Sequence, residues 1–163
     1  MTMPASAAGT SGGRPSLRVL VPVDGSPGSD CAVRYVVELA RRSRPVEVLV
    51  LNVEPSLTYI ETLVSPAQML ADYWSDSAGK QAARSACALL DAAGVSYSLH
   101  LVRGDPREAI GAFARQFECD LIVMGTRGMG GAANLVLGSV AAGVIQCADR
   151  PITLVKQAAQ RMT

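Results

Sequence analysis

The sequence predicts an open α/β fold, in which a five-stranded, mainly parallel sheet carries helices on both faces. Two observations predict it. Apolar, β-rich runs alternate with helical patterns along the chain, which is typical of parallel strands joined by crossover helices. The 163 residues suit one domain, and 49% of them are hydrophobic, which is enough for a core of Val, Leu, Ile and Ala. We expect this domain to span residues 17–157.

The strands are predicted from their composition. Residues 17–23, 47–53 and 121–125 are largely apolar on both faces, as strands in the middle of a parallel sheet usually are. Residues 95–102 and 152–156 instead alternate polar with apolar side chains. A half-polar strand suits the edge of a sheet, so we expect these two segments at the edges.

Four helical patterns separate the strands. Ser29 is a favourable N-cap for the first helix, and Gly94 suits the position just after the second. Asp105 and Pro106 are typical of an N-cap and a first helical turn. An irregular stretch, residues 54–65, precedes the second helix. The predicted helices span residues 29–42, 66–93, 106–117 and 139–148.

Composition argues against two classes of partner. The formal net charge is +1, so the chain would attract neither duplex DNA nor an anionic membrane surface strongly. No apolar run is long enough to span a bilayer. Residues 1–16 are rich in small residues and Pro and lack the apolar segment of a secretory signal. We expect a disordered tail there and a short second tail at residues 158–163.

The cysteines indicate a reducing compartment. No two of them form a CxxC pair, so the spacing indicates neither a zinc site nor a thioredoxin-type centre. Each stands among apolar neighbours, and we expect buried, reduced thiols in a cytoplasmic protein. The four residues are Cys31, Cys87, Cys119 and Cys147.

Glycine residues gather after the first and fourth predicted strands. In an open α/β sheet, ligands bind outside the carboxyl ends of the strands, where the strand order reverses. The fourth strand ends at Gly125, followed by Gly128 and Gly138, and Ser139 then opens the last helix. Glycine allows positive φ and close approach to a ligand, and the amides at a helix N-terminus bind anions. We interpret this segment as a phosphate cradle; the alternative is that these glycines serve only turns and helix–sheet packing.

Two charged residues flank these glycines. Asp24 follows the first strand directly, and we expect its carboxylate to contact a ligand. The alternative is that Asp24 only caps the following turn. Arg127 lies within the glycine segment, where a phosphate contact and a solvated position are equally plausible.

Taken together, these segments resemble the universal stress protein family. The family signature, G-x2-G-x9-G-[ST], fits the glycines after the fourth strand and Ser139 without a gap. Residues 21–29 resemble the family's opening strand and its Asp-Gly-Ser turn, and the resemblance covers about residues 16–156. It implies a Rossmann-like fold of the adenine nucleotide alpha-hydrolase type, with strand order 3-2-1-4-5.

The resemblance also implies a nucleotide site made of two sets of residues. The nucleoside is expected beside Pro22, Val23, Asp24, Val53, Met124 and Gly125. The phosphates are expected at Gly128, Gly138, Ser139 and Val140. Some members carry a hydroxyl group at the position of Ala141, so one phosphate contact is missing here.

The resemblance therefore implies an ATP-binding protein, with or without Mg²⁺, that acts as a nucleotide-responsive regulatory module in a stress response. It also implies a homodimer that pairs through residues 152–156. Two other functions stay open. One is slow ATP hydrolysis or phosphoryl transfer, although no matched general acid and base stand out in the sequence. The other is a dimeric interaction protein that binds no nucleotide.

Overall fold

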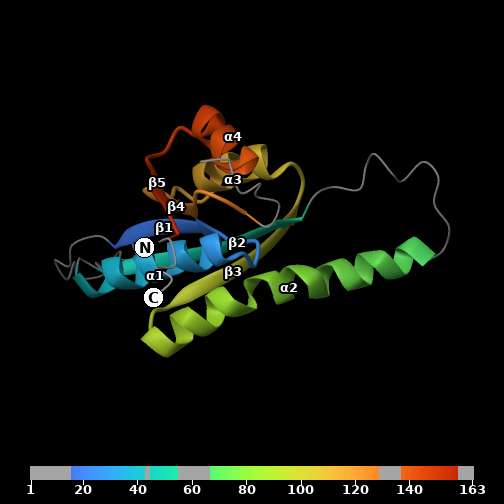
Figure 1. Cartoon of the computed structure of the whole chain (residues 1–163), viewed down its shortest axis with the longest axis horizontal. Helices are drawn as coiled ribbons and strands as arrows, with labels where there is room; N and C mark the ends of the chain where they lie inside the picture. Colours follow the sequence, from blue (N-terminus) through green and yellow to red (C-terminus); the bar gives the residue numbers. More distant parts are fainter. Residues whose placement is uncertain (1–15, 43–44, 55–66, 129–136, 158–163) are drawn as a thin grey trace, which may run out of the picture.

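The computed structural model describes most of the predicted domain (Figure 1). The described stretches are residues 16–42, 45–54, 67–128 and 137–157. Apart from Ser16 and Glu54, the expected tails at 1–16 and 158–163 and the irregular stretch at 54–65 lie outside the described residues.

Strands and helices alternate along the chain as predicted. In chain order the elements are β1 (Leu17–Pro22), α1 (Pro27–Arg42), β2 (Val46–Glu54), α2 (Ala67–Ala93), β3 (Tyr97–Arg103), α3 (Pro106–Gln116), β4 (Leu121–Gly125), α4 (Ser139–Cys147) and β5 (Ile152–Val155). The five strands form one sheet in the order β3-β2-β1-β4-β5, and every neighbouring pair is parallel. The predicted α/β class and strand order are confirmed.

The position of each strand in the sheet follows from its residues. Strands β1, β2 and β4 lie inside the sheet, and their central residues are buried. Strands β3 and β5, which alternate polar with apolar side chains, form the two edges and have no fully buried residue. The edge positions expected from the alternating pattern are therefore confirmed.

Helices cover both faces of the sheet. Helices α1 and α2 pack on one face, and α3 and α4 pack together on the other (Figure 1). Successive residues of a strand point to opposite faces, so each central strand contributes to two apolar layers. The layer under α1 and α2 includes Val19, Val21, Val33, Val36, Val48 and Val50. The layer under α3 and α4 includes Leu20, Leu49, Leu51, Ile110, Phe113, Ile122 and Val144.

The first helix begins two residues earlier than predicted. We expected Ser29 as its N-cap, but α1 starts at Pro27 and the capping hydroxyl belongs to Ser26. The Ser29 amide donates a hydrogen bond to Ser26 Oγ at 3.2 Å, and the Ser29 hydroxyl donates one to the Ser26 carbonyl at 2.8 Å. Proline suits the first helical position because it lacks an amide hydrogen and has a helical φ, so the helix can start at Pro27.

Helix α2 ends just before Gly94, as the sequence predicted. Gly94 has a φ of +66°, its amide donates to the Asp91 carbonyl, and the Val95 amide donates to the Leu90 carbonyl. These two bonds form a Schellman motif, which satisfies the last carbonyls of the helix. Because Val95 completes this motif, β3 starts at Tyr97, two residues later than predicted.

The start of α3 is also as predicted. Pro106 is its first residue, and the carboxylate of Asp105 accepts a hydrogen bond from the Arg107 amide at 2.8 Å. The chain therefore leaves β3 and enters α3 within a few residues, which brings the first turn of α3 near the carboxyl end of the sheet.

The cysteines are all free thiols, but they are not all buried. Cys119 is fully buried, and burial raises the pKa of its thiol. Cys31 and Cys87 are half-buried, and Cys147 is exposed. The expectation of burial was wrong for Cys147, because it is the last residue of α4 and lies beyond the buried Ala141 and Val144. Among the described helices, none has both the length and the apolar character needed to cross a bilayer.

Candidate functional site

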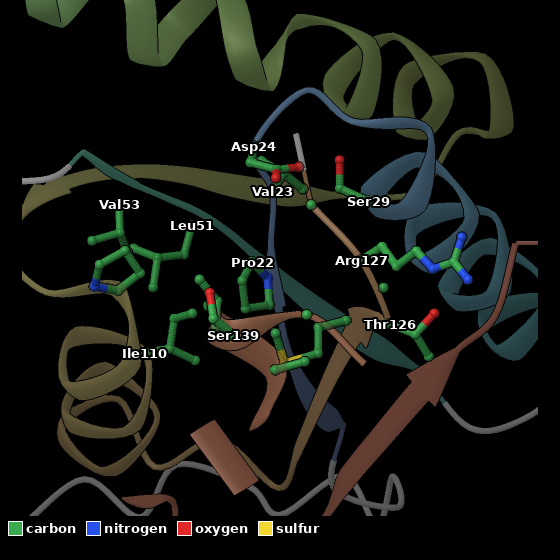
Figure 2. A pocket seen from close by; sticks show the side chains of 17 residues that line it. Pro22, Val23, Asp24, Ser29, Leu51, Val53, Ile110, Thr126, Arg127 and Ser139 are labelled. Carbon is green, nitrogen blue, oxygen red and sulfur yellow. The ribbon is translucent and has the colours of Figure 1, made fainter. Parts of the chain in front are cut away.

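A cavity of about 360 Å³ lies at the carboxyl ends of β1, β2 and β4 (Figure 2). Residues from the N-terminal parts of α3 and α4 also line it. Every site residue expected from the sequence contributes to its lining. These residues are Pro22, Val23, Asp24, Val53, Met124, Gly125, Gly128, Gly138, Ser139 and Val140. The fold thus brings together segments that are more than 100 residues apart in the chain.

The end of β1 is held firmly in place. The Val23 amide donates to the Leu51 carbonyl at 2.8 Å, and the Val23 carbonyl accepts from Nδ2 of Asn52, also at 2.8 Å. The next residue, Asp24, accepts a hydrogen bond from the Ser26 amide through Oδ1 at 3.0 Å. Asp24 therefore caps the turn and also lines the cavity, so the two roles considered for it are compatible.

The glycines after β4 are required by close packing. A Cβ added to Gly125 would lie 2.6 Å from the carbonyl carbon and oxygen of Gly28, and a Cβ on Gly28 would overlap the Arg127 carbonyl oxygen. A Cβ on Gly128 would overlap Oδ2 of Asp24. Neither Gly125, Gly128 nor Gly138 has a positive φ, so positive φ was the wrong reason to expect glycine there. The loops after β1 and β4 fit together only because these side chains are absent.

The N-terminus of α4 opens into the cavity. Gly138 is the N-cap with a φ of −72°, and it supplies no side-chain cap. Its own amide donates to the Thr126 carbonyl at 2.7 Å, and the first helical bond runs from the Ala142 amide to the Gly138 carbonyl. The amides of Ser139, Val140 and Ala141 come before that bond, so they lack the usual helical acceptor. All three residues line the cavity, where an anion would meet these donors and the positive end of the helix dipole.

An apolar surface forms part of the cavity wall. It consists of Leu51 and Val53 of β2 and Pro106 and Ile110 of α3. Sequence reasoning missed Leu51, Pro106 and Ile110. Signals for them existed, because Leu51 is two residues before Val53 on the same strand face, and Ile110 is one helical turn after Pro106.

Charged and hydroxyl side chains complete the site. Among the lining residues, Asp24 and Arg127 are the charged ones, and Ser29 and Thr126 add hydroxyl groups that the sequence did not indicate. Arg127 is exposed at the margin, and Figure 2 shows its side chain extending toward α1. Within the described part of the chain, no three His, Cys, Asp or Glu side chains gather as a metal site would require.

Comparison with known proteins points to one family. The model of the universal stress protein family matches residues 16–156. Universal stress protein MJ0531 of Methanocaldococcus jannaschii is 28% identical over 142 residues, which covers 86% of this chain and 82% of the relative. Universal stress protein YxiE of Bacillus subtilis is 25% identical over 146 residues, covering 85% of this chain and 98% of the relative.

Solved structures share the architecture. The structure of the protein MJ0577 has a TM-score of 0.73 at 25% identity and covers 88% of this chain and 98% of its own. A universal stress protein of Archaeoglobus fulgidus in complex with dAMP has a TM-score of 0.62 at 24% identity, with coverages of 86% and 98%. A family protein of Arabidopsis thaliana with AMP bound has a TM-score of 0.64 at 20% identity, with coverages of 90% and 95%. At these identities the last two show a common fold.

Proposed function

The chain belongs to the universal stress protein family, and from that premise we propose that it is a nucleotide-responsive regulatory module that binds ATP in the cavity. The observation that carries the proposal is that the open N-terminus of α4 and the Asp24 carboxylate line the same cavity as an apolar surface. A nucleotide needs all three features: anion donors, a polar contact for its sugar and a surface for its base. In this proposal, occupancy changes the loops around the cavity and so a partner interaction in a stress response.

The phosphates would bind at α4. Backbone amides at a helix N-terminus and the helix dipole together favour an anion. The amides of Ser139, Val140 and Ala141 supply such donors, and the Ser139 hydroxyl adds one more. Gly128 and Gly138 keep the approach to these donors open, because neither has a side chain that would occupy the space.

The nucleoside would lie between Asp24 and the apolar surface of β2 and α3. A carboxylate accepts hydrogen bonds from ribose hydroxyl groups, and aliphatic side chains such as Val53 and Ile110 pack well against a flat base. The cavity volume of about 360 Å³ lies within the usual range for small-molecule sites, roughly 300–1,000 Å³.

The structural neighbours support an adenine nucleotide as the ligand class. One of them holds AMP and another holds dAMP, which share the adenine base and one phosphate. ATP extends the same chemistry with two further phosphates. Mg²⁺ prefers oxygen ligands and is often bound through nucleotide phosphates, so here it would arrive with ATP and have Asp24 as the nearby carboxylate.

Isothermal titration of the nucleotide-stripped protein with ATP tests the proposal, and AMP and dAMP titrations with and without Mg²⁺ separate the ligands. We expect micromolar ATP binding that is lost in Gly138→Val. A Cβ added at this position would lie 3.3 Å from the Thr126 carbonyl oxygen, and the two methyl groups of valine would fill the approach to α4. Ala112→Val is the control, since Ala112 is exposed on α3 outside the cavity lining. No heat and no thermal stabilisation with any nucleotide would contradict the proposal. Phosphate release over several hours would instead favour a slow ATPase.

We also propose a homodimer that pairs through β5. This strand lies at an edge of the sheet and is only half-buried, so its outer backbone groups are available to a second chain. Sedimentation at micromolar concentration should give a dimer, and Thr153→Lys should shift the distribution toward monomer because an edge lysine opposes strand pairing. A monomeric wild-type protein at that concentration would rule the dimer out.

We also propose that the protein is cytoplasmic. The free thiols, one of them exposed at Cys147, suit a compartment that keeps cysteines reduced. Cell fractionation should recover the chain in the cytosolic fraction with its thiols reactive. Recovery of a disulfide-bonded form from an extracytoplasmic fraction would contradict this placement.

A further inference from the structure

Asn52 occupies a position where the sequence pattern calls for an apolar side chain. It follows Val48 and Val50 on the same face of β2, and both valines are fully buried under α1 and α2. Asn52 is itself only 5% exposed. A buried amide costs free energy unless its hydrogen bonds are replaced, and Asn is unfavourable in strands. Asn52 is therefore unfavourable for the stability of the core. Its presence calls for a reason other than packing.

The amide nitrogen of the Asn52 side chain is bonded to a residue of the cavity lining. Nδ2 of Asn52 donates to the Val23 carbonyl at 2.8 Å. Val23 is the residue before Asp24, and its amide is bound by the Leu51 carbonyl. Both backbone groups of Val23 are thus held by two consecutive residues of β2. The peptide that carries Asp24 can neither rotate nor shift along the sheet without breaking one of these bonds.

The side-chain oxygen of Asn52 makes no comparable contact. Oδ1 of Asn52 has no hydrogen-bond partner among the described residues. It faces α2 at Gly79, where an added Cβ would lie 2.9 Å from it. An apolar side chain of the same size would remove this unpaired oxygen. Core packing alone therefore favours an apolar residue at position 52.

We infer that Asn52 is a positioning residue for the nucleotide site, which holds the Val23 carbonyl so that the Asp24 carboxylate stays directed into the cavity. The inference rests on the proposed nucleotide binding and adds a residue to it that lies outside the cavity lining. Asn52 acts from the opposite face of the sheet, under α2. Its amide would orient Asp24 much as the residues behind a metal-binding side chain fix that side chain by hydrogen bonds.

The test compares nucleotide affinity with stability in Asn52→Leu. This change keeps the number and branching of the side chain's heavy atoms and removes its donor. We expect the midpoint of urea unfolding to stay close to that of the wild type, whereas the Kd for ATP rises roughly tenfold. Asn52→Ser should weaken binding similarly, because its hydroxyl is too short to reach the Val23 carbonyl, and it serves if the leucine variant folds poorly. Ser85→Ala is the control, since it removes the hydrogen bond to Asp30 that joins α2 to α1 outside the cavity lining.

Two further readouts separate positioning from a general loss of structure. The Val23 carbonyl ¹³C resonance should move upfield in Asn52→Leu, because the carbonyl loses a donor. In an Asp24→Asn background, Asn52→Leu should change the Kd much less than it does in the wild type, because the effect passes through Asp24.

The outcomes are distinct. If the wild type binds ATP and Asn52→Leu binds equally well, or weakens binding by the same factor with and without Asp24, the inference is overturned and the proposed function stands. If the wild type binds no nucleotide, the proposed function fails and takes the inference with it.

Discussion

The Asp24 carboxylate lies against the backbone of Gly128, so closely that a Cβ at position 128 would overlap Oδ2 of Asp24. Asp24 follows β1 and Gly128 follows β4, two strands that are neighbours in the sheet. Gly128, a glycine of the family signature, therefore leaves room for the side chain of Asp24 from another loop. A change at either residue must affect the other.

The first prediction concerns this contact. Gly128→Ala should displace the Asp24 carboxylate and weaken ATP binding, at a cost to stability below about 1 kcal/mol, because the overlapping Oδ2 is the end of a side chain that can move. In the double variant Asp24→Ala with Gly128→Ala the overlap disappears, so thermal unfolding should return toward that of Asp24→Ala alone. Simple additivity of the two changes in stability would show that residues 24 and 128 are not coupled, which contradicts this prediction.

A second prediction concerns the meeting of two backbones. Gly125→Ala would place a Cβ 2.6 Å from the carbonyl carbon of Gly28, and a backbone cannot move aside as a flexible side chain can. We expect a loss of about 3 kcal/mol in urea unfolding. Gly111→Ala is the matched control, because the nearest atom to its Cβ would be 3.6 Å away and alanine favours a helix interior by about 1 kcal/mol. Equal effects of the two changes would contradict the packing described.

The cap of α1 gives a third prediction. Ser26 is 2% exposed, and its hydroxyl oxygen accepts the Ser29 amide. Ser26→Ala should therefore destabilise the protein by about 1 kcal/mol. Ser96→Ala, at an exposed position before β3, should leave stability nearly unchanged. A cap at Ser29, as the sequence suggested, would instead make Ser29→Ala the more harmful change and Ser26→Ala nearly neutral.

Thiol reactivity provides a fourth prediction. Burial raises the pKa of the Cys119 thiol, so less of it is thiolate at pH 8, and the side chain is also inaccessible. A thiol reagent added to the folded protein should modify the exposed Cys147 rapidly and Cys119 only on unfolding. Cys147→Ser should remove the fast phase. Rapid modification of Cys119 in the native protein would show that its surroundings open readily.

Local signals and tertiary contacts differed in how well the sequence revealed them. Gly94 ends a helix, and Asp105 with Pro106 starts one, through interactions with near neighbours in the chain, so the sequence alone was enough to predict both. The edge strands followed from their alternating side chains. The α1 boundary was missed because two serines three residues apart are equally good caps, and only the fold decides between them.

The same difference between local signals and tertiary contacts applies to the candidate site. The glycines and Ser139 were found from their spacing, but the reason for glycine at Gly125 and Gly128 lies in contacts with residues about 100 positions away. Apart from Val53, the apolar side of the cavity was missed because β2 and α3 meet only in the folded chain. Asn52 carried a signal, a polar residue on an apolar strand face, but its meaning needs the bond to Val23.

The most direct test of nucleotide binding at α4 is an amide chemical-shift titration of the ¹⁵N-labelled protein with ATP. We expect the largest changes at the amides of Ser139, Val140 and Ala141, which come before the first helical hydrogen bond and line the cavity. Amides at the far end of the sheet, such as that of Leu17, should not move. Saturating ATP that leaves the α4 amides unchanged, or that shifts only residues outside the cavity, would contradict nucleotide binding at α4.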